Sequence, residues 1–147
     1  MLDCLYREES TGIVGPMTNY ASGRQQIEEP YTTLHELVLK YDTLYKGQQE
    51  ETGRIVGLCM LMKRQVIDAV GLLDERFSPG HYEDDDFCYR ARQAGFRLQI
   101  ARDTFIYHRG SASFGKQGNE ALQGLVEQNR LKFIEKWNRD PKDLINP

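Results

Sequence analysis

Apolar residues recur with helical spacing between residues 33 and 45. Five of them fall at i, i+3, i+4, i+7 and i+11, and so share one face: Leu34, Leu37, Val38, Tyr41 and Tyr45. This spacing is typical of an amphipathic helix whose apolar stripe packs against a core. Thr33 and Glu36 have the spacing of a capping box, so the pattern predicts a helix that begins just after Thr33.

Four further segments carry helical patterns: residues 2–6, 65–70, 83–94 and 122–137. Gly71 and Gly95 directly follow the second and third of these segments. Glycine adopts the left-handed conformation at a helix C-terminus at little cost, so both positions predict helix ends. Pro141 lies just beyond the last segment, where it cannot continue a helix.

Shorter apolar or alternating runs predict strands at residues 12–15, 54–63, 96–100 and 104–107. We expect the first strand to end at Pro16 and the second to be buried. Residues 47–53 are polar, which predicts a mobile connection. No repeat or linker divides the sequence, so the pattern predicts a single α/β domain over residues 1–147.

Composition narrows the class of protein. The chain has 147 residues and a net charge of −3, with 39% hydrophobic and 28% charged residues, as in soluble globular domains. No apolar run approaches the ~20 residues that cross a bilayer, and we expect no signal peptide and a cytoplasmic protein. An odd count of three cysteines argues against a disulfide framework, and the charge leaves no basic surface for nucleic acid.

Four consecutive carboxylates, residues 83–86, open the third helical segment. Helical geometry places Asp84 in line with Phe87, Cys88 and Ala91, the apolar stripe that faces a core or cleft. A catalytic hypothesis therefore falls on Asp84, which suits a general base. The alternative is that all four acids only complement the helix dipole, with Asp86 forming an ordinary i,i+4 pair with Arg90.

His108 follows the last predicted strand, where sheet gives way to loop. A neutral imidazole at this position is able to ligate a metal ion, although a histidine at a strand end is more often structural. One histidine is no metal site, so further oxygen ligands are required. His81, in the loop before the acids, is placed to touch a substrate, although a histidine in such a loop is more often incidental.

Three blocks, taken in order, resemble the C-terminal half of family 2 glycosyltransferases. They are Gly71-Leu-Leu-Asp-Glu75 with Phe77, Glu83-Asp-Asp-Asp-Phe-Cys-Tyr-Arg90 with Gly95, and His108 with Gly110 and Ser111. The family consists of inverting, nucleotide-sugar-dependent enzymes. The resemblance implies a GT-A fold, with a mixed sheet flanked by helices.

The resemblance also implies roles for particular residues. Asp84 matches the base that deprotonates the acceptor hydroxyl, and His108 matches a ligand of a divalent cation, Mn²⁺ or Mg²⁺. Asp74, Glu75, Glu83 and Asn19 are substrate-binding candidates. The implied partners are a nucleotide-sugar donor and a glycan or other hydroxyl acceptor.

One departure from the family pattern is important. The family places an Asp-x-Asp metal motif N-terminal to these blocks, whereas here the motif occurs only within Asp84–Asp86. We therefore expect a partial domain that lacks the nucleotide-binding half, and an isolated chain that neither binds nucleotide tightly nor transfers sugar. Surface exposed on the run 55–62 is expected to favour a homodimer.

Two rival hypotheses stay open. The chain is a non-catalytic module that binds sugar or a partner, if Asp84 is an exposed and ordinary carboxylate. Metal-dependent phosphoester hydrolysis is the weaker rival. It requires acids that converge on one or two ions, and these acids diverge from one helix turn.

Overall fold

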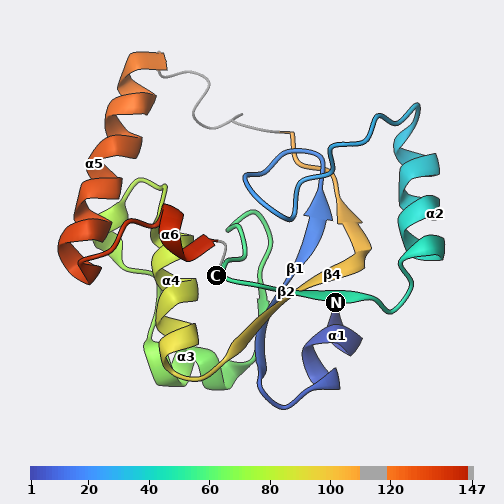
Figure 1. Ribbon diagram of the computed structural model, residues 1–147, viewed down its shortest axis with the longest axis horizontal. Coiled ribbons are helices and arrows are strands. Elements are labelled where there is room, and N and C mark those ends of the chain that lie inside the picture. The colour runs from blue at the N-terminus through green and yellow to red at the C-terminus, as the bar shows by residue number, and fades with distance from the viewer. Residues whose placement is uncertain (110–118, 146–147) are drawn as a thin grey trace.

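The computed structural model describes residues 1–109 and 119–145 (Figure 1). Its helices are α1 Leu2–Arg7, α2 Leu34–Leu44, α3 Arg64–Val70, α4 Glu83–Gln93, α5 Asn119–Trp137 and α6 Lys142–Ile145. A short 3-10 turn, η1, spans Glu75–Phe77. The strands are β1 Thr11–Thr18, β2 Gln49–Thr52, β3 Leu61–Met62 and β4 Arg97–Ile106. The protein is therefore α/β, as the sequence predicts.

The four strands form one mixed sheet in the order β2-β4-β1-β3. The central pair, β1 and β4, is parallel, while β2 and β3 run antiparallel to their neighbours. Thr18 pairs with Ile106, so both central strands end at the same edge of the sheet. In Figure 1, α2 lies to the right of the strands and α3, α4 and α5 lie to the left.

Successive side chains of β1 point to opposite faces of the sheet, so neighbouring residues pack into different apolar clusters. Ile13 joins the larger apolar cluster, which includes Leu37 of α2 and Phe87 of α4. Val14 joins a smaller cluster with Leu5 of α1. The sheet thus anchors α4, whose N-terminus carries the acidic residues, to the centre of the fold.

The helix signals in the sequence are confirmed. Thr33 caps α2, and its side-chain oxygen accepts a hydrogen bond from the Glu36 amide at 3.2 Å. Gly71 and Gly95 follow α3 and α4 with φ of 78° and 89°, positive values that glycine adopts at little cost.

The prediction that the first strand ends at Pro16 was wrong, because β1 continues to Thr18. Pro16 pairs with Ala101 of β4 on one side. On its other side β3 pairs only with Ile13 and Val14. The missing proline N–H therefore removes no bond of the sheet.

The predicted buried strand at 54–63 was also wrong, because only Leu61–Met62 pairs with β1. Ile55 is fully buried in the core, but it lies in an irregular segment. This segment passes beside the N-terminus of α4, where Arg54 and Gly57 bond to its carboxylates. The homodimer was expected to form through an exposed strand at residues 55–62. Residues 55–60 do not form a strand, so the homodimer stays a prediction without that support.

The extent of two strands was predicted wrongly because both contain charged residues that interrupt the apolar pattern. The segment expected to be mobile contains β2, and β4 is one strand instead of two. Glu50 of β2 pairs with Arg102 of β4, and Glu51 pairs with Arg97. Cross-strand ion pairs thus replace the apolar alternation that predicts strands.

None of the helices in residues 1–109 and 119–145 has the length and apolar character needed to cross a membrane. The longest, α5, carries charged residues along its whole length, among them Glu127, Arg130 and Lys136. Its side chains contact the 77–81 segment and α4, as shown below.

Candidate functional site

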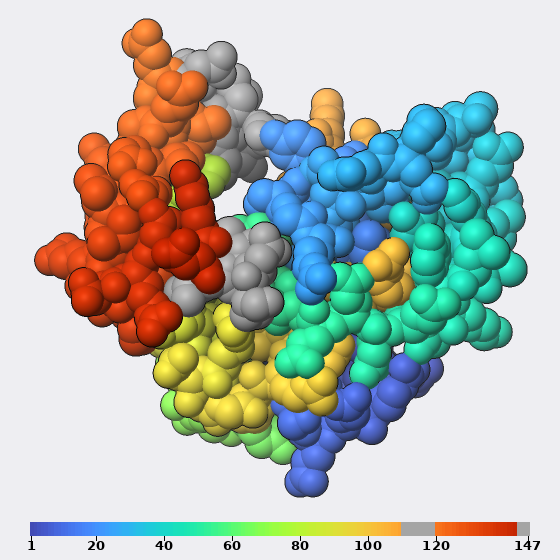
Figure 2. Space-filling model, in the orientation of Figure 1, coloured from blue at the N-terminus to red at the C-terminus, as the bar shows by residue number. Residues whose placement is uncertain are grey.

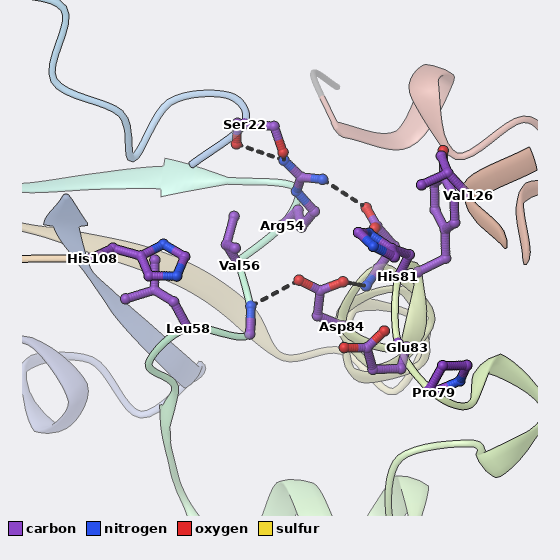
Figure 3. A pocket seen from close by; sticks show the side chains of 14 residues that line it. Ser22, Arg54, Val56, Leu58, Pro79, His81, Glu83, Asp84, His108 and Val126 are labelled. Atoms are coloured by element: carbon purple, nitrogen blue, oxygen red, sulfur yellow. Dashed lines mark hydrogen bonds and ion pairs between the residues drawn. The ribbon is translucent and has the colours of Figure 1, made fainter. Parts of the chain in front are cut away.

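A cleft of about 460 Å³ opens beside the N-terminus of α4. We call it the main cleft. Fourteen residues line it, drawn from the segment after β1, residues 54–58, residues 79–85, the end of β4 and α5 (Figure 3). The face shown in Figure 2 is hollowed between the C-terminal helices, in orange and red, and the blue N-terminal segments.

Asp84 lies in the first turn of α4 and is half-buried in the wall of the main cleft. Its Oδ2 accepts a hydrogen bond from the Gly57 amide at 2.8 Å, and its Oδ1 accepts one from the Asp85 amide at 2.9 Å. Phe87, Cys88 and Ala91, which share its helical face, are all buried. The side chain therefore stands where the apolar stripe of α4 meets the cleft.

His108 lines the main cleft on the side opposite Asp84 (Figure 3). Asn19 holds its backbone, because Asn19 Nδ2 donates to the His108 carbonyl at 3.0 Å and the His108 amide donates to Asn19 Oδ1 at 2.8 Å. Asn19 thus supports His108 and does not line the cleft itself. Gly110 and Ser111, which follow His108 in the motif, lie outside the described residues.

The ring of His108 has the orientation of a potential metal ligand. Its Nδ1 lies 2.7 Å from the carbonyl oxygen of Tyr20. A carbonyl only accepts, so Nδ1 is the donor, and in the neutral ring Nε2 has the lone pair. Histidines that bind metals are commonly held in this way. In the described ranges, however, no three His, Cys, Asp or Glu side chains group to hold an ion.

Asp85 also lines the main cleft, where it forms a largely buried ion pair with Arg54. Its Oδ1 lies 3.2 Å from Arg54, whose second guanidinium nitrogen donates to the carbonyl and hydroxyl oxygens of Ser22 at 2.6 and 2.7 Å. Burial, and then the adjacent Asp84 carboxylate, raise the pKa of Asp85 to about 7, against the opposing charge of Arg54. Arg54 therefore links the segment after β1 to α4.

The predicted i,i+4 pair of Asp86 with Arg90 is present, but it is not an ordinary pair, because Asp86 is fully buried. Its carboxylate bonds Arg90 at 2.8 Å, Lys136 at 2.7 Å and the indole nitrogen of Trp137 at 2.8 Å. Arg90 also donates to the carbonyls of Val70 and Leu72. Asp86 thus joins α4 to α5, while Asp84 and Asp85 face other partners, so the three acids diverge.

Glu83 lines the main cleft beside Asp84. Burial, offset in part by its own backbone N–H and reinforced by Asp84, raises the pKa of this carboxyl. Its Oε2 is buried and has no hydrogen-bond partner among the described residues. The Glu83 side chain thus borders the main cleft, while its Oε2 is turned away from solvent.

Asp74 and Glu75 lie outside the main cleft and line a second cavity of about 290 Å³. Asp74 is engaged by Arg76 at 2.9 Å and Lys136 at 2.7 Å. Burial raises the pKa of Asp74, but the bond from Lys136 and the amide of Arg76 lower it to about 2. Asp74 is thus a structural anchor, and Glu75 is the carboxylate left to meet a ligand.

Three residues of the site were missed in the sequence. Arg54 and Gly57 contact the acids of α4, and Asn129 of α5 is fully buried and bonds the segment that precedes them. Two sequence signals could have pointed to them: Arg54 is a single cation at the start of an apolar run, and Asn129 is a polar residue on the apolar stripe of the last helix. Neither signal shows which residue the side chain contacts, because that depends on the fold.

Comparison with known proteins adds one distant relative. No known protein family matches the chain, and no solved structure matches it. The chain is 27% identical over 123 residues to a Sinorhizobium fredii protein named Uncharacterized protein y4gI. The alignment covers 77% of this chain but 14% of that protein, so the chain spans a small part of that relative's length.

Proposed function

We propose that this chain provides the acceptor side of an inverting glycosyltransferase similar to family 2, built on part of a GT-A fold. In this proposal Asp84 is the general base and the main cleft holds the acceptor. The observation that carries the proposal is that Asp84 and His108, 24 positions apart and matched independently to the family motifs, line one cleft.

The position of the cleft supports this proposal. Thr18 and Ile106 end two adjacent parallel strands; Asn19 directly follows the first, and His108 lies two residues beyond the end of the second. In open α/β sheets, ligands bind in the crevice outside the carboxyl ends of such strands. The main cleft occupies this position and holds a carboxylate on its other wall.

The proposed chemistry is a direct displacement. An Asp84 oxygen takes the proton as the acceptor O–H bond breaks, and the acceptor oxygen forms a bond to the anomeric carbon of the donor. The bond from that carbon to the nucleoside diphosphate breaks on the opposite face, which inverts the configuration. Base catalysis of this kind contributes about 10²–10⁴-fold to the rate.

The divalent cation belongs to the proposal as well. His108 is suited to be one of its ligands through Nε2, and the other ligands are left to the diphosphate, to water and to groups outside the described residues. When bound, such an ion neutralises charge on the departing diphosphate. The residues of this chain hold the acceptor and take up its proton.

A transfer assay tests the proposed function. The complete gene product is incubated with Mn²⁺, a panel of UDP-, GDP-, dTDP- and CMP-linked sugars and a panel of glycoside acceptors, and release of the nucleotide is measured. We expect one donor to react in an acceptor-dependent way. If no donor reacts while sugars bind in the main cleft, the second candidate below is favoured.

The second candidate is a non-catalytic sugar-binding module. One observation favours it: both oxygens of Asp84 already accept backbone amide bonds, from Gly57 and Asp85. A carboxylate bonded in this way also serves to fix the 54–58 segment on α4. The two candidates differ in whether a sugar nucleotide is consumed, and both place sugar in the same cleft.

A further inference from the structure

The second cavity adjoins the main cleft. Pro79, Gly80 and Glu83 line both of them, so these three residues form the ridge between the two spaces. Figure 3 shows Pro79 and Glu83 on the side of the main cleft that carries Asp84. A ligand longer than one ring that rests against Asp84 therefore has a second space within reach.

The ridge is held in place from below by Asn129 of α5. Its Nδ2 donates to the carbonyls of Phe77 and Gly80, each at 2.7 Å, and to that of His81 at 3.2 Å. Lys132 donates to Asn129 Oδ1 at 2.8 Å, which leaves the amide nitrogen facing the segment. Because Asn129 is fully buried, the ridge has a fixed support.

The backbone within the ridge is strained. His81 and Tyr82, between Gly80 and Glu83, have φ of 72° and 71°, a conformation that is unfavourable for residues other than glycine. Such strain persists where the surrounding structure imposes it, often at ligand sites. Here it turns the chain so that the ridge stands beside the first turn of α4.

The second cavity has one apolar side and one acidic side. Leu73 and Pro79 offer apolar surface, and Leu73 is 51% exposed, while Glu75 supplies a carboxylate. Glu83 lines both spaces and adds a second carboxyl group where they meet. A sugar ring has an apolar C–H face and a hydroxyl edge, and so matches both sides.

We propose that the two spaces are subsites for one acceptor glycan of at least two sugar units. The unit that carries the reacting hydroxyl lies in the main cleft against Asp84. Glu83 accepts a hydroxyl hydrogen bond at the junction, and the next unit lies on Leu73 with its hydroxyl edge towards Glu75. This inference rests on the proposed function, because it assigns the class of acceptor for the same site.

Binding of matched sugars to the 147-residue chain tests the inference. The probes are the methyl glycosides of glucose, galactose, mannose and N-acetylglucosamine, and the corresponding disaccharides cellobiose, lactose, mannobiose and chitobiose. Affinity is measured from backbone amide shifts in ¹H–¹⁵N spectra. We expect one disaccharide to bind about tenfold more tightly than its monosaccharide, with shifts at Gly57 and at Glu75.

Two leucine variants provide the control. Leu73→Ser is expected to lower disaccharide affinity to that of the monosaccharide and to leave the monosaccharide unaffected. Leu72→Ser changes the neighbouring side chain, which is 76% exposed and does not line the cavity. It is expected to change neither affinity.

The outcomes separate the two proposals. If a monosaccharide binds in the main cleft but the disaccharide gains nothing and Leu73→Ser has no effect, the two-subsite inference is wrong and the proposed function stands. If no sugar shifts the amides of the main cleft, both the acceptor site and the inference are rejected.

Discussion

Asn19 and His108 hold each other through two reciprocal hydrogen bonds, 3.0 Å from Asn19 Nδ2 to the His108 carbonyl and 2.8 Å from the His108 amide to Asn19 Oδ1. These residues lie 89 positions apart, just beyond the ends of the two parallel strands. The pair therefore joins the two strand ends and fixes the wall of the main cleft that carries the His108 ring.

Asn19→Ala removes both bonds of this pair. We expect the free energy of unfolding to fall by about 1–2 kcal/mol, because two partly buried backbone groups lose their partner. Urea unfolding measures the loss. Asn19→Asp keeps the acceptor for the His108 amide but places a carboxylate oxygen against the His108 carbonyl, so it is not expected to restore stability. A loss below about 0.5 kcal/mol in Asn19→Ala would contradict the stabilising role of the pair.

Asp86→Asn leaves Arg90 and Lys136 without their shared carboxylate. Asp86 is fully buried, so we expect unfolding free energy to fall by about 3–5 kcal/mol. The matched control is Asp68→Asn, whose pair with Arg64 is exposed on α3 and, being screened by solvent, is expected to contribute little to stability. Similar unfolding midpoints for the two variants would contradict the role of Asp86 as a buried anchor.

Alanine substitutions at two glycines are expected to change protein stability in opposite directions. A Cβ at Gly15 would lie 2.5 Å from Ile55 Cγ2 and 2.6 Å from Gln25 Nε2, both in buried side chains. We expect Gly15→Ala to destabilise by about 1–3 kcal/mol. Gly124 lies in α5 with open space around it, so Gly124→Ala is expected to stabilise by about 0.5–1 kcal/mol. Thermal unfolding of both variants checks the two signs.

The Arg54–Asp85 pair predicts a pH dependence. The pKa of Asp85 rises from 3.8 to about 7 on folding, so between these values the folded protein holds a proton that the unfolded chain has lost. Stability from this group is therefore lost as pH rises from about 4 to 7. The unfolding free energy of wild type minus that of Asp85→Asn should therefore fall as pH rises over that range. A value that rises instead would mean that Arg54 outweighs burial and lowers this pKa.

Much of the fold is predictable from local signals. Thr33 and the glycines after α3 and α4 mark helix ends through backbone chemistry that acts within one turn. The strands were harder, because β2 and the middle of β4 depend on pairs such as Glu50 with Arg102, which are distant in sequence. Pro16 lies within a strand because its outer side has no paired strand, which only the topology reveals.

The candidate site shows the same division. Helical periodicity selects Asp84 from four adjacent acids, because its face continues into the buried Phe87 and Cys88. The burial of Asp86 depends on Lys136 and Trp137, about fifty residues away on α5. No periodicity predicts that contact, so an acid that looks like a surface residue in the sequence lies in the core.

The most direct test of the central claim is the turnover rate of Asp84→Asn with the donor and acceptor that react in the transfer assay. Asn keeps an acceptor for the Gly57 amide but is a poor base. We expect kcat to fall by at least about 10²-fold with the fold intact, and Asp68→Asn to behave as wild type. Turnover within about twofold of wild type in Asp84→Asn would show that Asp84 is not the base.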